Sequence, residues 1–270
     1  MPTIKRPGGI EIHWQMQGDQ GPLVFLVHQI LWSYPEVYAD LIADLARDHR
    51  VVVYDPRGCG RSSRVGPYDI QTDAGDLLAV ADTVGGGPVA IAVGYGYNVV
   101  ARVAALRSDL ISQVLSVGPA AAAMLPREEL RGSEVMAASE SVIEMILKML
   151  ETDPRAALHM ILAATNPELA EDQLRERIDR AQDYLSPEAA LDRAQAWLQD
   201  DATEQALVLG DRLWILHGEA EPLFEGTLRM RVAELYPKAH IEELTGGLVS
   251  RPEVMAARVR GLTVAGQNGS

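Results

Sequence analysis

The stretch Val51-Val52-Val53-Tyr54-Asp55-Pro56-Arg57-Gly58-Cys59-Gly60-Arg61-Ser62 joins a short apolar run to a loop rich in glycine and charge. Short apolar runs bounded by turn residues are typical of strands that are buried on both faces of a sheet. Similar runs occur at residues 23–27, 89–93, 114–117 and 213–216. The alternation of apolar and polar residues at 10–16 predicts one further, half-buried strand.

Segments with helical periodicity separate the early strands, at residues 38–47 and 73–84. Strands that alternate with helices predict an α/β protein with a mainly parallel, doubly wound sheet.

The pattern changes after residue 119, where runs typical of buried strands stop and amphipathic helices follow. These helices are expected at 139–151, 155–164, 168–184 and 187–199, and proline follows a capping residue at three of the predicted starts. The sequence therefore predicts a core of residues 1–119 and 207–270, and a helical cap, or lid, of residues 120–206.

Composition narrows the classes of function. The 270 residues carry a formal net charge of −14, which disfavours nucleic acid and anionic membranes as partners. The lone cysteine, Cys59, excludes an intrachain disulfide and fits a reducing compartment. No apolar run is long enough to span a bilayer, and the histidines are scattered. We expect a soluble cytoplasmic protein without a metal or other cofactor, and a homodimer stays open.

Ligands of open α/β sheets bind beyond the carboxyl ends of the strands, so the residues at those ends matter most. They are His28-Gln29, the Asp55–Ser62 loop, Gly94-Tyr95-Gly96-Tyr97-Asn98, the residues from His217 to Pro222, and Gly246-Gly247-Leu248. This series resembles the α/β-hydrolase fold superfamily, in its capped, cofactor-free branch. The Asp-x-Arg-Gly-x-Gly-x-Ser loop and the final Gly-Gly carry the resemblance, which covers nearly the whole chain.

The catalytic positions depart from that family. The resemblance implies a catalytic triad formed by the serine of a Gly-x-Ser-x-Gly elbow, an acid and a histidine. It also implies a His-Gly motif whose glycine leaves the oxyanion hole free of a side chain. The nucleophile position is Gly96 and the histidine position is Leu248, whereas the acid position keeps a carboxylate, Glu221. Gln29 places a side chain at the oxyanion motif. The triad is therefore degenerate, and Gly96 is expected to keep only the strained elbow backbone that glycine adopts freely.

A second resemblance concerns the elbow alone. Residues 94–104 are similar to the elbow of the N-myc downstream-regulated family, a non-enzymatic branch of the same fold that has glycine in place of the serine. This similarity implies that such an elbow is compatible with a stable fold.

Ordinary structural roles are expected for most remaining polar groups near the strand ends. We expect His28 and His217 to hydrogen-bond loop backbone, Asp55 and Arg57 to brace loops, and Ser62 to be a loop or cap residue.

Several other side chains are expected to have no chemical role. Cys59 could be a displaced nucleophile, but the sequence places no imidazole or ammonium group beside it. Tyr95 and Tyr97 are expected to fill space beside the elbow. Arg102 and Arg107 are expected to be helix-surface charges.

Three classes of function follow. The first is a non-hydrolytic binder of a small apolar or carbonyl-bearing ligand, because Gly and Leu in place of Ser and His widen the cleft. The second is an enzyme with rewired, non-covalent chemistry: a lyase, isomerase or cyclase. The third is a structural or interaction protein. The expected ligand pocket lies under the cap and is lined by His28, Gln29, Trp32, Tyr95, Gly96, Tyr97, Glu221 and Leu248.

The protein is expected to lack serine-hydrolase activity, because Gly96 offers no hydroxyl to attack a carbonyl. Release of p-nitrophenol from p-nitrophenyl acetate and butyrate should not exceed the buffer rate, and fluorophosphonate probes should not label the chain. Stoichiometric labelling of any serine would contradict this expectation.

Overall fold

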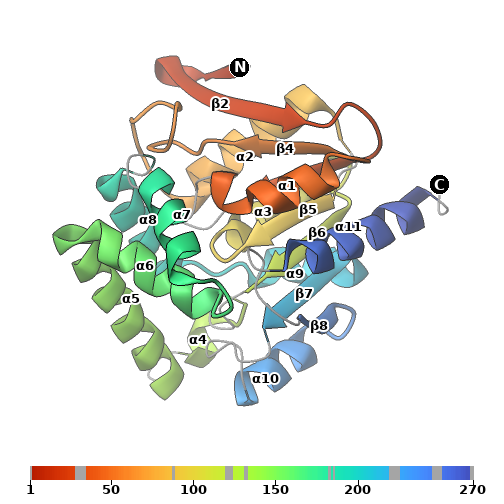
Figure 1. The fold of residues 1–270 in the computed structure, drawn as a ribbon. Coiled ribbons are helices and arrows are strands. Elements are labelled where there is room, and N and C mark those ends of the chain that lie inside the picture. The colour runs from red at the N-terminus through yellow and green to blue at the C-terminus, as the bar shows by residue number, and fades with distance from the viewer. Residues whose placement is uncertain are drawn as a thin grey trace.

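A computed structural model of the chain describes residues 2–27, 35–86, 89–118, 124–130, 133–181, 184, 186–218, 226–244 and 251–267. Within these residues one eight-stranded sheet has the order β1-β2-β4-β3-β5-β6-β7-β8 (Figure 1). The strands are β1 (Thr3–Arg6), β2 (Ile10–Gln17), β3 (Leu23–Val27), β4 (Arg50–Tyr54), β5 (Val89–Val93), β6 (Gln113–Val117), β7 (Leu213–Gly218) and β8 (His240–Leu244). The pairings of β2 with β1 and β4 are antiparallel and the others are parallel, which confirms the expected mainly parallel sheet.

Helices cover both faces of the sheet, as a doubly wound fold requires. On one face α1 (Ala39–Leu45) packs against α11 (Pro252–Gln267). On the other face α3 (Gly96–Leu106) packs between α2 (Ile70–Val84) and α9 (Thr203–Leu209), and Figure 1 shows the sheet between these two layers. The apolar runs of the central strands are buried on both sides because each face meets a helical layer.

The helical region expected after β6 is present. It comprises α4 (Arg127–Leu130), α5 (Glu134–Thr152), α6 (Pro154–Thr165), α7 (Glu171–Ala181) and α8 (Pro187–Gln199). Asp153 and Ser186 cap α6 and α8, because each side chain accepts a hydrogen bond from a backbone N–H in the first turn. The helix predicted at 168–184 is shorter than expected at both ends, and the boundary predicted after residue 206 falls inside α9.

The elements that the sequence did not indicate include β1, β8 and α10 (Thr227–Leu235). The two strands lie at the edges of the sheet and are only partly buried, so their sequences lack a continuous apolar run. Across the described residues, no helix combines the length and the apolar character that a membrane crossing requires.

The connection between β2 and β3 depends on a close approach of two backbone segments. A Cβ atom added at Gly18 would lie 2.0 Å from the His49 carbonyl oxygen, and one at Gly21 would lie 1.9 Å from the Asp48 carbonyl oxygen. Both glycines also have positive φ, 83° and 78°. Glycine is therefore required where this turn meets the loop before β4, the strand that lies between β2 and β3.

Replacing Gly21 with alanine should lower the free energy of unfolding by about 3 kcal/mol or more, because the new methyl group overlaps a backbone carbonyl. Gly8→Ala is the matched control, since Gly8 has nearly the same φ, 79°, and nothing within 4 Å of its added Cβ. The control should cost about 1 kcal/mol. Urea unfolding followed by circular dichroism measures both, and equal losses would contradict the steric explanation.

Candidate functional site

The elbow lies between β5 and α3, at the carboxyl edge of the sheet. Gly94 makes the turn with a φ of 50°, and α3 begins at Gly96, which is buried. Gly96 does not have a positive φ, so our expectation that it holds the strained elbow backbone is wrong. The left-handed residue of this turn is Gly94, and Gly96, the position expected from the sequence to correspond to the nucleophile, is an ordinary first residue of a helix.

Tyr95, just before Gly96, directs its hydroxyl away from solvent into a buried ion pair. Its hydroxyl donates a hydrogen bond to Oδ2 of Asp73 on α2, at 2.7 Å. Burial, and then the negative charge of Asp73, raises the pKa of the Tyr95 phenol well above its usual value. The hydroxyl is therefore engaged and neutral, which leaves the ring and backbone of Tyr95 as the parts able to face a ligand.

Tyr97, just after Gly96, is buried in the core. Its hydroxyl has no hydrogen-bond partner among the described residues, although Tyr236 lies close to it. Burial, and then Tyr236, raises the pKa of the Tyr97 phenol. Neither tyrosine beside the elbow is placed to act as a proton donor or base at neutral pH.

Asn98 and Arg102 fix the first turns of α3 to the end of α8. The Asn98 amide nitrogen donates to Oδ2 of Asp200 at 2.6 Å, and Arg102 pairs with the same carboxylate. The Trp197 indole N–H donates to the Asn98 amide oxygen at 3.2 Å. The expectation that Arg102 is a plain surface charge is wrong, because this pair is mostly buried. Arg107, in contrast, is an exposed partner of Asp82 and Asp109, as expected.

The Asp55–Ser62 loop is braced as predicted. The backbone N–H of Arg61 donates to the Asp55 carboxylate at 2.9 Å, and the Ser62 hydroxyl donates to the Asp55 carbonyl oxygen. Arg57 binds Asp76 through two nitrogens, at 2.6 and 3.0 Å. His217, at the end of β7, has Nδ1 at 3.0 Å from the Gly218 carbonyl oxygen, which confirms its predicted contact with backbone.

Cys59 is fully buried in this loop. A guanidinium nitrogen of Arg193, on α8, lies 3.9 Å from its sulfur, a neighbour that the sequence did not indicate. Because no side-chain surface of Cys59 reaches solvent, the structure gives no support to a displaced nucleophile at this position.

The remaining predicted site residues lie outside the part of the chain that the structure describes. They are His28, Gln29, Trp32, Glu221 and Leu248. Their roles stay predictions, and so does a cavity between them and the elbow. Met145, on α5, is one of the exposed large apolar side chains.

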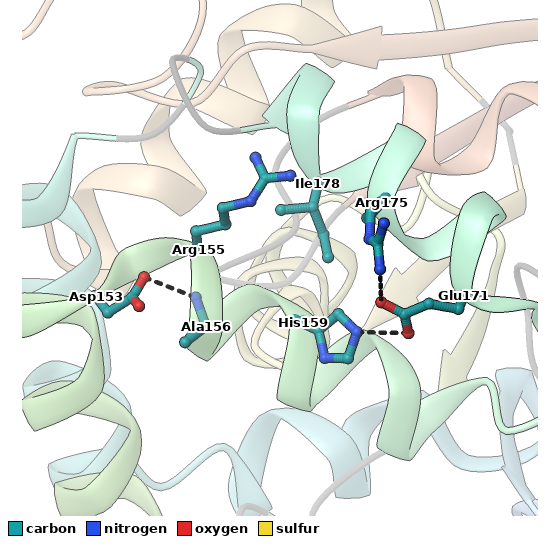
Figure 2. Close-up of a pocket in the computed structure, with 7 residues that line it drawn as sticks. All are labelled: Asp153, Arg155, Ala156, His159, Glu171, Arg175 and Ile178. Carbon is teal, nitrogen blue, oxygen red and sulfur yellow. Dashed lines mark hydrogen bonds and ion pairs between the residues drawn. The ribbon is translucent and has the colours of Figure 1, made fainter.

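A pocket that the structure does describe lies in the helical region, between α6 and α7. Its volume is about 250 Å³, and none of the predicted pocket residues lines it. Figure 2 shows His159 of α6 and Arg175 of α7 both directed toward Glu171. The sequence placed these residues on amphipathic helices, but it could not show which of them pair across the two helices. Within the described residues no group of three or more metal-ligating side chains comes together.

The sheet order, the two helical layers and the strand-to-helix elbow define an α/β-hydrolase fold. A family model described as "Alpha/beta hydrolase family" matches residues 24–258. The chain therefore belongs to the alpha/beta hydrolase family.

Solved structures show the same fold at low sequence identity. A bromoperoxidase from Bacillus anthracis has a TM-score of 0.76 at 19% identity, with 99% of both chains covered. An esterase from Rhodococcus sp. ECU1013 has a TM-score of 0.75 at 22% identity, with 98% of both chains covered. An enol-lactonase from Burkholderia xenovorans LB400 has a TM-score of 0.71 at 20% identity, covering 99% of this chain and 100% of that chain.

One curated protein is more similar over a shorter stretch. Polyketide synthase ThaQ from Burkholderia thailandensis is 36% identical over 104 residues, which are 38% of this chain. The chain spans about 5% of the length of that relative.

The two tyrosines beside Gly96 should respond differently to loss of their hydroxyl groups. Tyr95→Phe removes a hydrogen bond to a buried carboxylate and should cost about 1–2 kcal/mol of unfolding free energy. Tyr97→Phe removes a buried hydroxyl without a partner and should change stability by less than about 0.5 kcal/mol, or raise it. Urea unfolding measures both, and equal losses would show that Tyr97 has a partner.

Proposed function

We propose that the chain is a non-hydrolytic member of its family that binds a small apolar or carbonyl-bearing molecule beside the elbow. The observation that carries this proposal is the chemistry at the elbow itself. Position 96 has no side chain, and the hydroxyls of Tyr95 and Tyr97 are buried away from any substrate. An acyl-enzyme cannot form where no side chain can attack.

The proposed pocket lies between the core and the helical region. The division into a core of residues 1–119 and 207–270 and a cap of 120–206 is part of the proposal, with the end of the cap moved before α9 because α9 packs against α3. The residues predicted to line the pocket form its walls. Gly96, which has no side chain, forms the floor of the pocket, where a ligand carbonyl group would contact the backbone. We also propose a cytoplasmic location, on the basis of the lone buried cysteine and the acidic charge.

The burial of Tyr95 and Tyr97 also weakens the alternative function, an enzyme with rewired, non-covalent chemistry. A lyase or isomerase needs a group that can move a proton at neutral pH, and burial raises the pKa of both phenols. Any such chemistry would depend on residues other than Tyr95 and Tyr97. The binding role therefore has the stronger support.

The relatives suggest which compounds to test first. Esterases and a lactonase are among the proteins of similar fold, and part of the chain is similar to part of a polyketide synthase. Suitable probes are p-nitrophenyl butyrate, δ-decanolactone and an acetoacetyl thioester of N-acetylcysteamine, which all carry a carbonyl group on an apolar chain.

At least one of these probes should bind without turnover. Saturation-transfer NMR measures binding, and product signals in the same spectra report turnover. Gly96→Ala should weaken binding about tenfold, because a methyl group would occupy the proposed floor. Gly261→Ala is the control, since its added Cβ on α11 meets nothing within 4 Å, and it should leave binding unchanged.

Two outcomes would contradict the proposal. Product formation from any probe by the unmodified protein would show an enzyme. Binding that Gly96→Ala and Gly261→Ala affect equally would place the ligand somewhere other than the elbow.

A further inference from the structure

Helix α8 is joined to the core at three points along its length. At its start, the 58–60 loop and the residues before α8 exchange backbone hydrogen bonds. The Gly60 N–H donates to the Tyr184 carbonyl oxygen at 2.8 Å, and the Ser186 N–H donates to the Gly58 carbonyl oxygen at 2.9 Å. The Tyr184 hydroxyl also donates to the Asp55 carboxylate at 2.6 Å.

The middle of α8 is held by a buried ion pair. Arg193 donates two hydrogen bonds to Asp73 on α2, at 2.6 and 2.8 Å, and one to the Arg57 carbonyl oxygen at 2.8 Å. The side chains of Arg193 and Asp73 are only 1% and 3% exposed. Burial disfavours the Arg193 charge, but Asp73 outweighs this effect and raises the pKa of the guanidinium. Separating this pair would leave two uncompensated charges in the core.

The end of α8 is held by the Asp200 carboxylate, which binds Asn98 and Arg102 of α3. At the same end, the Arg127 guanidinium of α4 donates to the backbone carbonyl oxygens of Asp200 and Trp197, each at 3.0 Å, which joins α8 to another helix of the same region. These carbonyls lie at the carboxyl end of the helix, where a positive charge is favourable.

The attachment of α7 to the core is of a different kind. Its apolar face packs on the core, but its described polar link is the pair Arg177–Asp40 at 3.4 Å, in which Asp40 is 71% exposed. Exposed pairs contribute little to stability, and apolar surfaces can separate without leaving a buried charge unpaired.

We propose that α8 stays attached to the core through the Arg193–Asp73 pair even when the rest of the helical region opens. Any such opening occurs at α5–α7. The Asp73 carboxylate oxygen that accepts a hydrogen bond from Arg193 also accepts one from the Tyr95 hydroxyl, so α8 is linked through Asp73 to the residue before Gly96. This inference concerns how the region is attached and holds whether or not a ligand binds at the elbow.

Native-state hydrogen exchange of the full chain in increasing urea tests the proposal. Amides of α8 should exchange only with global unfolding, with protection within about threefold of that in α3. Amides of α7 should exchange through a smaller opening, with protection at least about tenfold lower. If α8 exchanges together with α7 through the same partial opening, α8 does not stay attached to the core and the proposal is wrong.

A pair of variants tests the role of Arg193. Arg193→Met should lower the protection of α8 relative to α3 by about tenfold or more, whereas Arg193→Lys, which keeps the charge, should lower it less. Arg175→Met, which breaks an exposed pair on α7, is the control and should leave that ratio unchanged. If Arg193→Met does not fold, Asp200→Asn replaces it and should lower protection at the last turn of α8 by several-fold. An unchanged ratio in the folded Arg193 or Asp200 variant overturns the proposal.

Discussion

The carboxylate of Asp73 is buried, so other groups of the protein must take the place of the water that would otherwise solvate it. Arg193 supplies two donors and Tyr95 a third, so one carboxylate joins α2, α8 and the elbow. A few residues away, Asp76 is bound by Arg57 and Arg6 in the same manner. The Asp76 pairs hold β1 and the loop after β4 to α2, whereas the Asp73 pair holds α8 to the core, and removing one partner of either carboxylate would leave an unsolvated charge.

The proposed absence of a nucleophile leaves the backbone elements of the elbow in place. The strand, the turn and the helix that would present a nucleophile are all in place, and α3 is tied firmly to the end of α8 through Asn98 and Arg102. Position 96 is a glycine, and the neighbouring phenols serve packing and an internal hydrogen bond. In the proposed binding role, this part of the backbone would contact a ligand without attacking it.

The sequence predicted most of the sheet because the central strands must be apolar on both faces, a requirement that leaves continuous runs such as residues 23–27 and 89–93. It could not predict β8, since an edge strand that is half exposed has no such pattern. At the site, the absence of a serine could be deduced from position 96 alone. The partners of Tyr95 and Arg102 could not, because Asp73 and Asp200 come close only when helices distant in sequence pack together.

The turn at Gly94 and Gly96 also bears on how the chain could be re-engineered. A working nucleophile depends on backbone strain that lifts its oxygen out of the helix. In this chain the left-handed residue lies two positions earlier, so a hydroxyl installed at 96 would start from relaxed helical geometry. Recovering hydrolysis would therefore require a different backbone conformation from residue 94 onward, in addition to new side chains at the catalytic positions.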